Sequence, residues 1–228
     1  MQPGRRGISW LRLGLGWFLL NLALTIQNIW PTPWITTHNK FSFEIALLLL
    51  VLAVYAELKG VPPRRLIGWL AVGLTLLTIG RYAQVTAPAL YGRPVNLYWD
   101  AQHLPRVAAM LTQVSPTWLV ALASLATMVL VGGLFLALRW ALGSVWAGLS
   151  QAGPRRGMAV LAAGVAAIYL AAPGLQLHTG RWFSNPVMPV YARQAEFLWE
   201  ALIGDTQGDT LRCKTLPASD LARLAGAD

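Results

Sequence analysis

The stretch that decides the fold is TWLVALASLATMVLVGGLFLALRWAL, residues 117–142, in which Arg139 is the only charged side chain. A helix rises 1.5 Å per residue, so about 20 predominantly apolar residues cross a hydrocarbon core of about 30 Å. The stretch therefore has the length and composition of a transmembrane helix. Similar apolar segments lie on both sides of it, at residues 10–29, 41–58, 66–86 and 158–177.

The composition of the whole chain agrees with a membrane-embedded fold. Of 228 residues, 56% are apolar, and the charged side chains are only 18 basic and 9 acidic. A soluble domain of this size would have to expose much of that apolar surface to water. We expect an all-α, polytopic membrane protein, with a five-helix transmembrane bundle, an interfacial helix and a short exported helical tail.

Basic residues mark every second connection between the apolar segments. They precede the first segment, join the second to the third and join the fourth to the fifth: Arg5, Arg6 and Arg12; Lys59, Arg64 and Arg65; Arg139, Arg155 and Arg156. By the positive-inside rule these clusters predict a cytoplasmic N-terminus and outward-facing connections at residues 30–40 and 91–116. The net charge of +9 thus reflects topology and contact with anionic lipids, and it does not favour nucleic-acid binding.

The chain divides into two parts at the end of the last apolar segment. Residues 1–177 are predicted to form the five-span domain, with the first segment retained as an anchor. Residues 178–228 contain no span and read as an exported juxtamembrane tail, which places the protein in the cell (inner) membrane with its C-terminal tail extracytoplasmic. Helices are expected at 96–111, in the outer interface, and at 189–202, followed by a turn-rich linker at 204–210 and a short helix from Ser219.

A group of arginines and aromatic residues begins near the end of the third apolar segment and continues after it. A lipid head group at the outer surface would suit these donors and rings, because a guanidinium binds phosphate in a bidentate manner. The candidate lipid-binding residues are Arg81, Arg93, Arg106, Tyr98 and Trp99. The simpler interpretation is that the arginines are separate interfacial anchors, with Arg81 reaching outward from the end of its helix.

Catalytic and metal-binding patterns are weak. The histidines His38, His103 and His178 fall in three different outward segments, and they lack the short His-x-x-His spacing typical of a zinc site. There is no nucleophile elbow, phosphate loop or dinucleotide fingerprint. The single cysteine, Cys213, has no partner for an intramolecular disulfide. We therefore predict no catalytic residue and no metal site in this chain.

Two segments resemble a known family. These are RYAQVTAPALYGRPVNLYWD at 81–100 and NPVMPVYARQAEFL at 185–198. Together with five spans that exit on the outer side, they look like the N-terminal membrane domain of sulfatase-like membrane proteins. These belong to the alkaline phosphatase superfamily, which includes lipoteichoic acid synthase and the phosphoglycerol and phosphoethanolamine transferases.

The resemblance implies that a catalytic α/β domain follows the tail and carries an acidic metal ligand, a Thr or Ser nucleophile, and Asp and His ligands for a divalent metal. No position in this chain matches those residues. We expect a non-catalytic anchor domain, truncated or encoded separately, whose partners are membrane lipids, including anionic ones, and a catalytic domain in cis or in trans. The alternative is a stand-alone lipid-sensing or partner-docking membrane protein. A small transporter is disfavoured, because the spans lack buried carboxylates and repeat symmetry.

Overall fold

The computed structural model describes residues 4–37, 40–60, 63–176, 178, 180 and 182–204, and these are mostly helical. The elements are α1 (Gly4–Thr25), β1 (Ile26–Asn28), β2 (Ile35–Thr37), α2 (Phe43–Lys59), α3 (Arg64–Tyr91), α4 (Leu97–Val114), α5 (Thr117–Leu149), α6 (Ala152–Ala171) and α7 (Met188–Gly204). The prediction of a helical fold is confirmed at this level. The predicted helix from Ser219 and most of the predicted linker at 204–210 lie outside the described residues.

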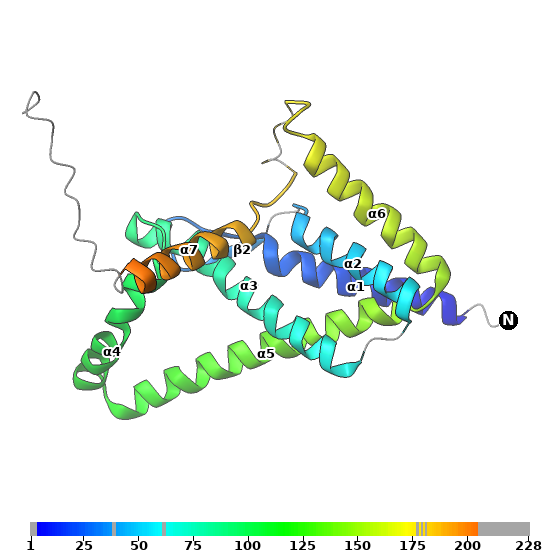
Figure 1. Cartoon of the computed structure of the whole chain (residues 1–228). Helices are drawn as coiled ribbons and strands as arrows, with labels where there is room; N and C mark the ends of the chain where they lie inside the picture. Colours follow the sequence, from blue (N-terminus) through cyan, green and yellow to red (C-terminus); the bar gives the residue numbers. More distant parts are fainter. Residues whose placement is uncertain are drawn as a thin grey trace, which may run out of the picture.

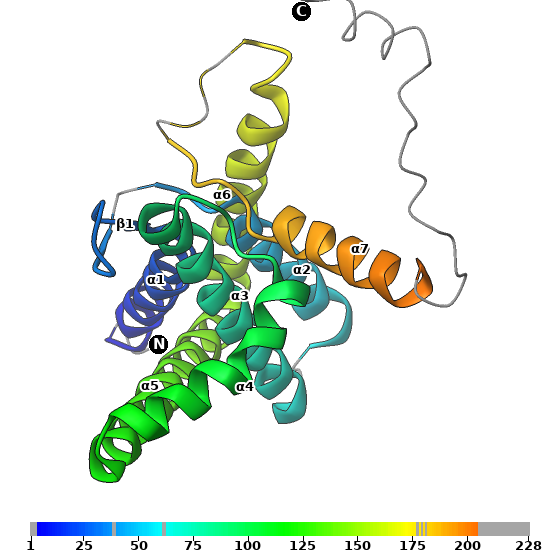
Figure 2. The same ribbon diagram turned by 90° about the vertical axis from the view of Figure 1, so that its left-hand side faces the viewer.

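The connections of the helices alternate between two ends of the molecule. The start of α1, the α2–α3 connection and the α5–α6 connection lie at one end, on the right in Figure 1. We call this the N-terminal end, and we call the end that carries the β1–β2 hairpin the hairpin end. Helices α1 and α3 run toward the hairpin end, whereas α2 and α5 run toward the N-terminal end. Figure 2 shows the chain after α6 turning back across the bundle before α7 begins.

The tightest packing joins α1 to the second half of α5. A methyl group added at Gly16 would come within 2.7 Å of the Ala141 carbonyl oxygen, and one added at Gly148 would overlap the Leu13 side chain. Small residues let two helices approach closely, and van der Waals packing at such contacts holds helices together in a membrane. The core around this contact consists mainly of Leu13, Leu20 and Leu24 of α1, Ile45 and Leu49 of α2, and Leu142, Val145 and Leu149 of α5.

The fourth predicted apolar segment ends earlier than the helix that contains it. The helix α5 continues past residue 142 to Leu149, because Val145 and Trp146 are buried in the core and extend its packed surface. The next helix starts at Ala152 instead of 158, so Arg155 lies in its first turn. There the Arg155 Nη2 atom lies 2.5 Å from the Glu57 Oε2 atom and links α6 to α2.

The helix α3 extends past residue 86, where the third predicted apolar segment ends, and Pro88 does not break it. The helix continues through it to Tyr91, because a proline removes only one helical hydrogen bond and its carbonyl still accepts one, here from the Gly92 backbone N–H at 3.0 Å. Gly92 ends the helix in the left-handed conformation, with φ at 67°. Such a conformation favours glycine.

The hairpin was not predicted. Strands β1 and β2 have three residues each and pair antiparallel, with Ile26 opposite Thr37. Strands this short leave no clear alternation in the sequence. Because β1 follows directly after Thr25, the first helix ends four residues before the predicted limit at 29.

Among the helices that the structure describes, two are long and apolar enough to cross a membrane, α3 and α5. The first half of α5 projects from the bundle in Figure 1, and large apolar side chains on it are exposed, including Leu122, Leu125 and Met128. A surface of this kind is expected where lipid chains, and not water, surround a helix.

Candidate functional site

The chain after α6 returns to the hairpin end and pairs with the start of α2. The Phe41 backbone N–H donates to the Trp182 carbonyl at 2.8 Å, and the Ser184 N–H donates to the Phe41 carbonyl at 3.0 Å. The Ser184 hydroxyl also donates to the Leu24 carbonyl at 3.2 Å. Residues 182–188 are therefore built into the ends of α1 and α2. We call this segment, with Asn21, Glu44 and Arg81, the clamp.

Arg81 joins α3 to this segment. The residue is only 4% exposed. Its Nε–H donates to the Ile26 carbonyl at 3.1 Å, and its Nη1 donates to the Asn185 carbonyl at 3.3 Å and to the Gln84 Oε1 at 3.3 Å. A buried guanidinium is stable only when such acceptors surround it. In this arrangement Arg81 connects the hairpin, α3 and the segment that leads to α7.

Glu44, which the sequence did not single out, holds the start of α7. It lies in the first turn of α2, and its Oε1 accepts hydrogen bonds from the backbone N–H groups of Val187 at 2.8 Å and Met188 at 2.5 Å. Those N–H groups lie at a helix N-terminus, where no helical carbonyl is available to them and where the helix dipole favours an anion. The carboxylate of α2 thus caps α7.

Asn21 completes the clamp from α1. Its Nδ2 donates to the Lys40 carbonyl at 2.6 Å, and its Oδ1 accepts from the Ser42 N–H at 2.8 Å. The only sequence signal for this role was an amide side chain in the middle of an apolar segment. A polar side chain in such a position needs a partner inside the protein, but the sequence does not say which one.

Helix α7 is also held further along its length. The Tyr191 hydroxyl donates to the Leu76 carbonyl of α3 at 2.6 Å, and Gly80 leaves room for the ring, since a methyl group there would overlap the Tyr191 hydroxyl. Burial raises the pKa of Tyr191, and the backbone of Gly80 partly offsets this. Gln194 links α7 to the start of α4, because its Oε1 accepts from the Leu97 N–H at 2.9 Å and its Nε2 donates to the Val95 carbonyl at 2.8 Å.

The other candidate lipid-binding residues lie on or next to α4, which has no buried residue. The Arg93 Nη2 donates to the Asp100 Oδ1 at 2.6 Å, and the Asp100 Oδ2 accepts from the Asn96 N–H at 2.9 Å. The Arg93 guanidinium and the Asn96 N–H lower the pKa of Asp100, and Asp100 raises the pKa of Arg93. The rings of Tyr98 and Trp99 meet edge to face, with centroids 5.1 Å apart.

The five candidate residues therefore do not share one set of contacts. Arg81 bonds the hairpin and residue 185, Arg93 bonds Asp100, and Arg106 is exposed on α4. Whether the group on α4 binds lipid stays a prediction. Of the three histidines, His103 and His178 are exposed, and His38 lies outside the described residues. Among the described residues, no group of three His, Cys, Asp or Glu side chains could hold a metal ion.

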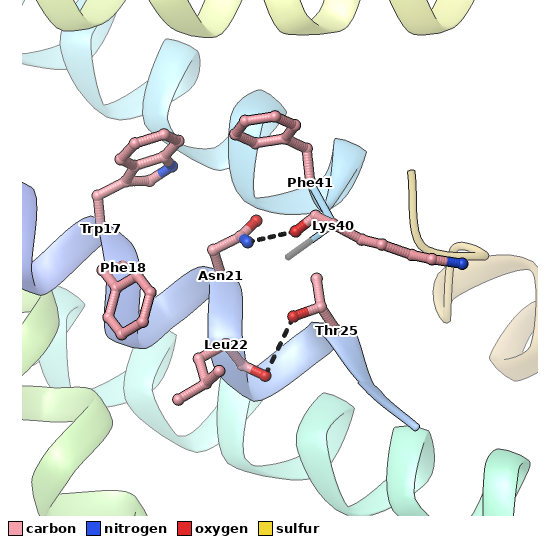
Figure 3. A pocket seen from close by; sticks show the side chains of 7 residues that line it. All are labelled: Trp17, Phe18, Asn21, Leu22, Thr25, Lys40 and Phe41. Carbon is pink, nitrogen blue, oxygen red and sulfur yellow. Dashed lines mark hydrogen bonds between the residues drawn. The ribbon is translucent and has the colours of Figure 1, made fainter. Parts of the chain in front are cut away.

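A hollow lies beside the clamp, between α1 and the start of α2. It has a volume of about 240 Å³ and is lined by Trp17, Phe18, Asn21, Leu22, Thr25, Lys40 and Phe41. Figure 3 shows the Trp17 and Phe18 rings at one end of the hollow, the Phe41 ring between them and Lys40, and the Lys40 side chain extending away from the rings at the other end. The Lys40 Nζ donates to the Gly180 carbonyl at 2.6 Å. The lining of the hollow is therefore mostly apolar, and Lys40 provides one cation at its rim.

No protein-family model, curated protein or solved structure matches the chain.

Proposed function

We propose that the chain is a membrane anchor domain of a sulfatase-like phosphotransferase or hydrolase that acts on lipid or glycan head groups at the outer leaflet. It is itself non-catalytic, and a catalytic domain works with it in cis or in trans. It crosses the inner membrane five times, through α1, α2, α3, α5 and α6, with the N-terminal end in the cytoplasm. The proposal rests on the sequence resemblance and on the construction of the hairpin end.

Three observations support this topology. Within the described part of the chain, two helices have the length and apolarity of spans. The connections at the N-terminal end carry the basic clusters, which favour the cytoplasmic side. Exposed tryptophans lie at both ends of the bundle, with Trp69 near the start of α3 and Trp30 and Trp34 in the hairpin turn. Tryptophan is enriched at the two membrane–water interfaces.

The observation that carries the anchor function is the clamp. A flexible tail would suffice to keep a following domain near a membrane. Here, however, residues 182–188 are bonded to α1, α2 and α3, and α7 is bonded to α3 and α4. Such a connection fixes the direction in which α7 leaves the bundle. An enzyme that acts on head groups benefits from a fixed position, because orientation contributes directly to rate.

A pair of reporter fusions tests the proposal. Alkaline phosphatase, which is active only outside the cytoplasm, is fused after Gly204 or after Gly60. We expect activity from the first fusion, retained in carbonate-washed membranes, and none from the second. This result would mean that the chain holds an exported enzyme at the membrane. Activity at Gly60 and none at Gly204 would contradict the topology and the anchor function together.

The non-catalytic assignment is tested with the purified chain. Incubated with zinc, magnesium or manganese, it should leave chromogenic phosphate and sulfate esters intact, because such chemistry needs a metal-bound nucleophile in a dense ligand set. Metal-dependent hydrolysis that disappears on replacing His38, His103 or His178 by alanine would overturn this assignment.

A further inference from the structure

The lining of the hollow between α1 and the start of α2 changes from apolar at one end to cationic at the other. Its apolar end is formed by Trp17 and Phe18, about two helical turns before α1 ends at Thr25. Its cationic end is Lys40, a few residues before α2 begins at Phe43. Residues 17 and 25 are separated by about 12 Å along the helix at 1.5 Å per residue. The hollow therefore passes from apolar to cationic as it approaches the hairpin end (Figure 3).

We infer that this hollow binds a single outer-leaflet phospholipid, whose phosphate lies at Lys40 and one of whose acyl chains lies against Trp17, Phe18 and Leu22. The inference rests on the proposed topology, in which the hairpin end faces the outer leaflet. A phospholipid there points its phosphate outward and its chains inward, which is the direction of the polarity gradient.

The size and charge of the hollow fit this occupant. Pockets for whole drug-sized ligands measure roughly 300–1,000 Å³. At about 240 Å³ and open at the side, this one accommodates part of a molecule whose remainder lies in the bilayer. The Lys40 ammonium has three donors and gives one to the Gly180 carbonyl, so two remain for phosphate oxygens. An aromatic and aliphatic lining suits an acyl chain.

The test measures binding of phosphatidylglycerol to the full chain by native mass spectrometry in detergent. The variant Lys40→Gln keeps a side-chain donor for Gly180 and removes the charge, and Leu22→Trp fills the apolar end. The matched control is Lys59→Gln, at the other end of α2. Each variant is checked for an unchanged unfolding midpoint, and the Gly204 reporter is read on each.

We expect the wild type and Lys59→Gln to bind one phosphatidylglycerol equally tightly. Lys40→Gln should weaken this binding about ten- to a hundredfold, the range for loss of a charged hydrogen bond. Leu22→Trp should weaken phosphatidylglycerol and phosphatidylcholine alike, and glycerol phosphate should not compete. Binding unchanged in both variants, or displaced by glycerol phosphate, would overturn the site. If the Gly204 reporter stays active in that case, the anchor proposal stands, whereas an inactive Gly204 reporter would overturn both.

Discussion

In the clamp, Arg81 is 4% exposed and bonds the carbonyls of Ile26 and Asn185, which are 55 and 104 residues away. Next to α4, the Arg93 side chain is 61% exposed and bonds Asp100, seven residues away. The two arginines are only 12 positions apart in the sequence, and both were candidates for the same lipid site. The first holds remote segments together, whereas the second stabilises only its own loop. Proximity in sequence therefore does not make two arginines parts of one site.

The comparison is tested most strongly by removing each arginine. Arg81→Gln should lower the free energy of unfolding by about 3 kcal/mol, because the Ile26 and Asn185 carbonyls lose a charged donor in a buried place. Arg93→Gln should lower the free energy of unfolding only slightly, since water can replace the partner in an exposed ion pair. Denaturant titration in detergent measures both. Equal losses in the two variants would mean that the clamp is no more important than the surface pair.

A methyl group at Gly80 tests whether α7 needs its close approach to α3. Gly80→Ala should lower the free energy of unfolding by about 1–3 kcal/mol, because the Tyr191 ring has to move. Gly73→Ala is the control on the same helix, where an added methyl meets no atom within 4 Å and alanine favours the helix.

Spin labels report the position of α7 in these variants. The pair Leu90→Cys and Ala195→Cys is placed in a background with Cys213→Ser. The distribution of interlabel distances should broaden in Gly80→Ala and stay narrow in Gly73→Ala. A sharp distance in both would show that α7 is not held at Gly80.

Tyr191→Phe removes one hydrogen bond and keeps the ring, so we expect a loss of about 1 kcal/mol. The pH dependence of stability tests the same hydrogen bond more sharply. The pKa of Tyr191 is raised in the folded protein, so the stabilisation is complete below the usual pKa near 10 and is lost as the pH rises through the folded pKa. The wild type should lose stability above pH 10 more steeply than Tyr191→Phe, and parallel curves would contradict a stabilising hydrogen bond from this partly buried hydroxyl.

The smallest effect is expected at Asp100. The pKa of Asp100 is lowered, so its contribution to stability is present above the ordinary value of 3.8 and is lost as the pH falls through the folded pKa. A spin label at Ala108→Cys, with Cys213→Ser, should become more mobile below that range. In Asp100→Asn it should be mobile at every pH. A label equally ordered in both proteins would mean that the Arg93 pair does not hold the start of α4.

The helices were largely predictable from the sequence, because apolar length and turn residues are local. Helices α4 and α7 occur close to the predicted 96–111 and 189–202. The clamp was not predictable, since Glu44, Asn21 and Ser184 acquire their roles only when distant segments meet. Arg81 was recognised as a candidate site residue, but two of its partners are backbone carbonyls, which no sequence pattern identifies. The boundary predicted at residue 177 stays a prediction.

The order of the chain has a consequence for biogenesis. Ribosomes release α1, α2 and α3 long before residues 182–188, yet Asn185 and Ser184 supply partners for the ends of those helices. Until α6 has been synthesised and the chain has returned to the hairpin end, Arg81 and Glu44 lack part of their final bonding. The hairpin end therefore stays incomplete during synthesis until residues 182–188 have been made, and a late segment of the chain completes the packing of the earliest helices.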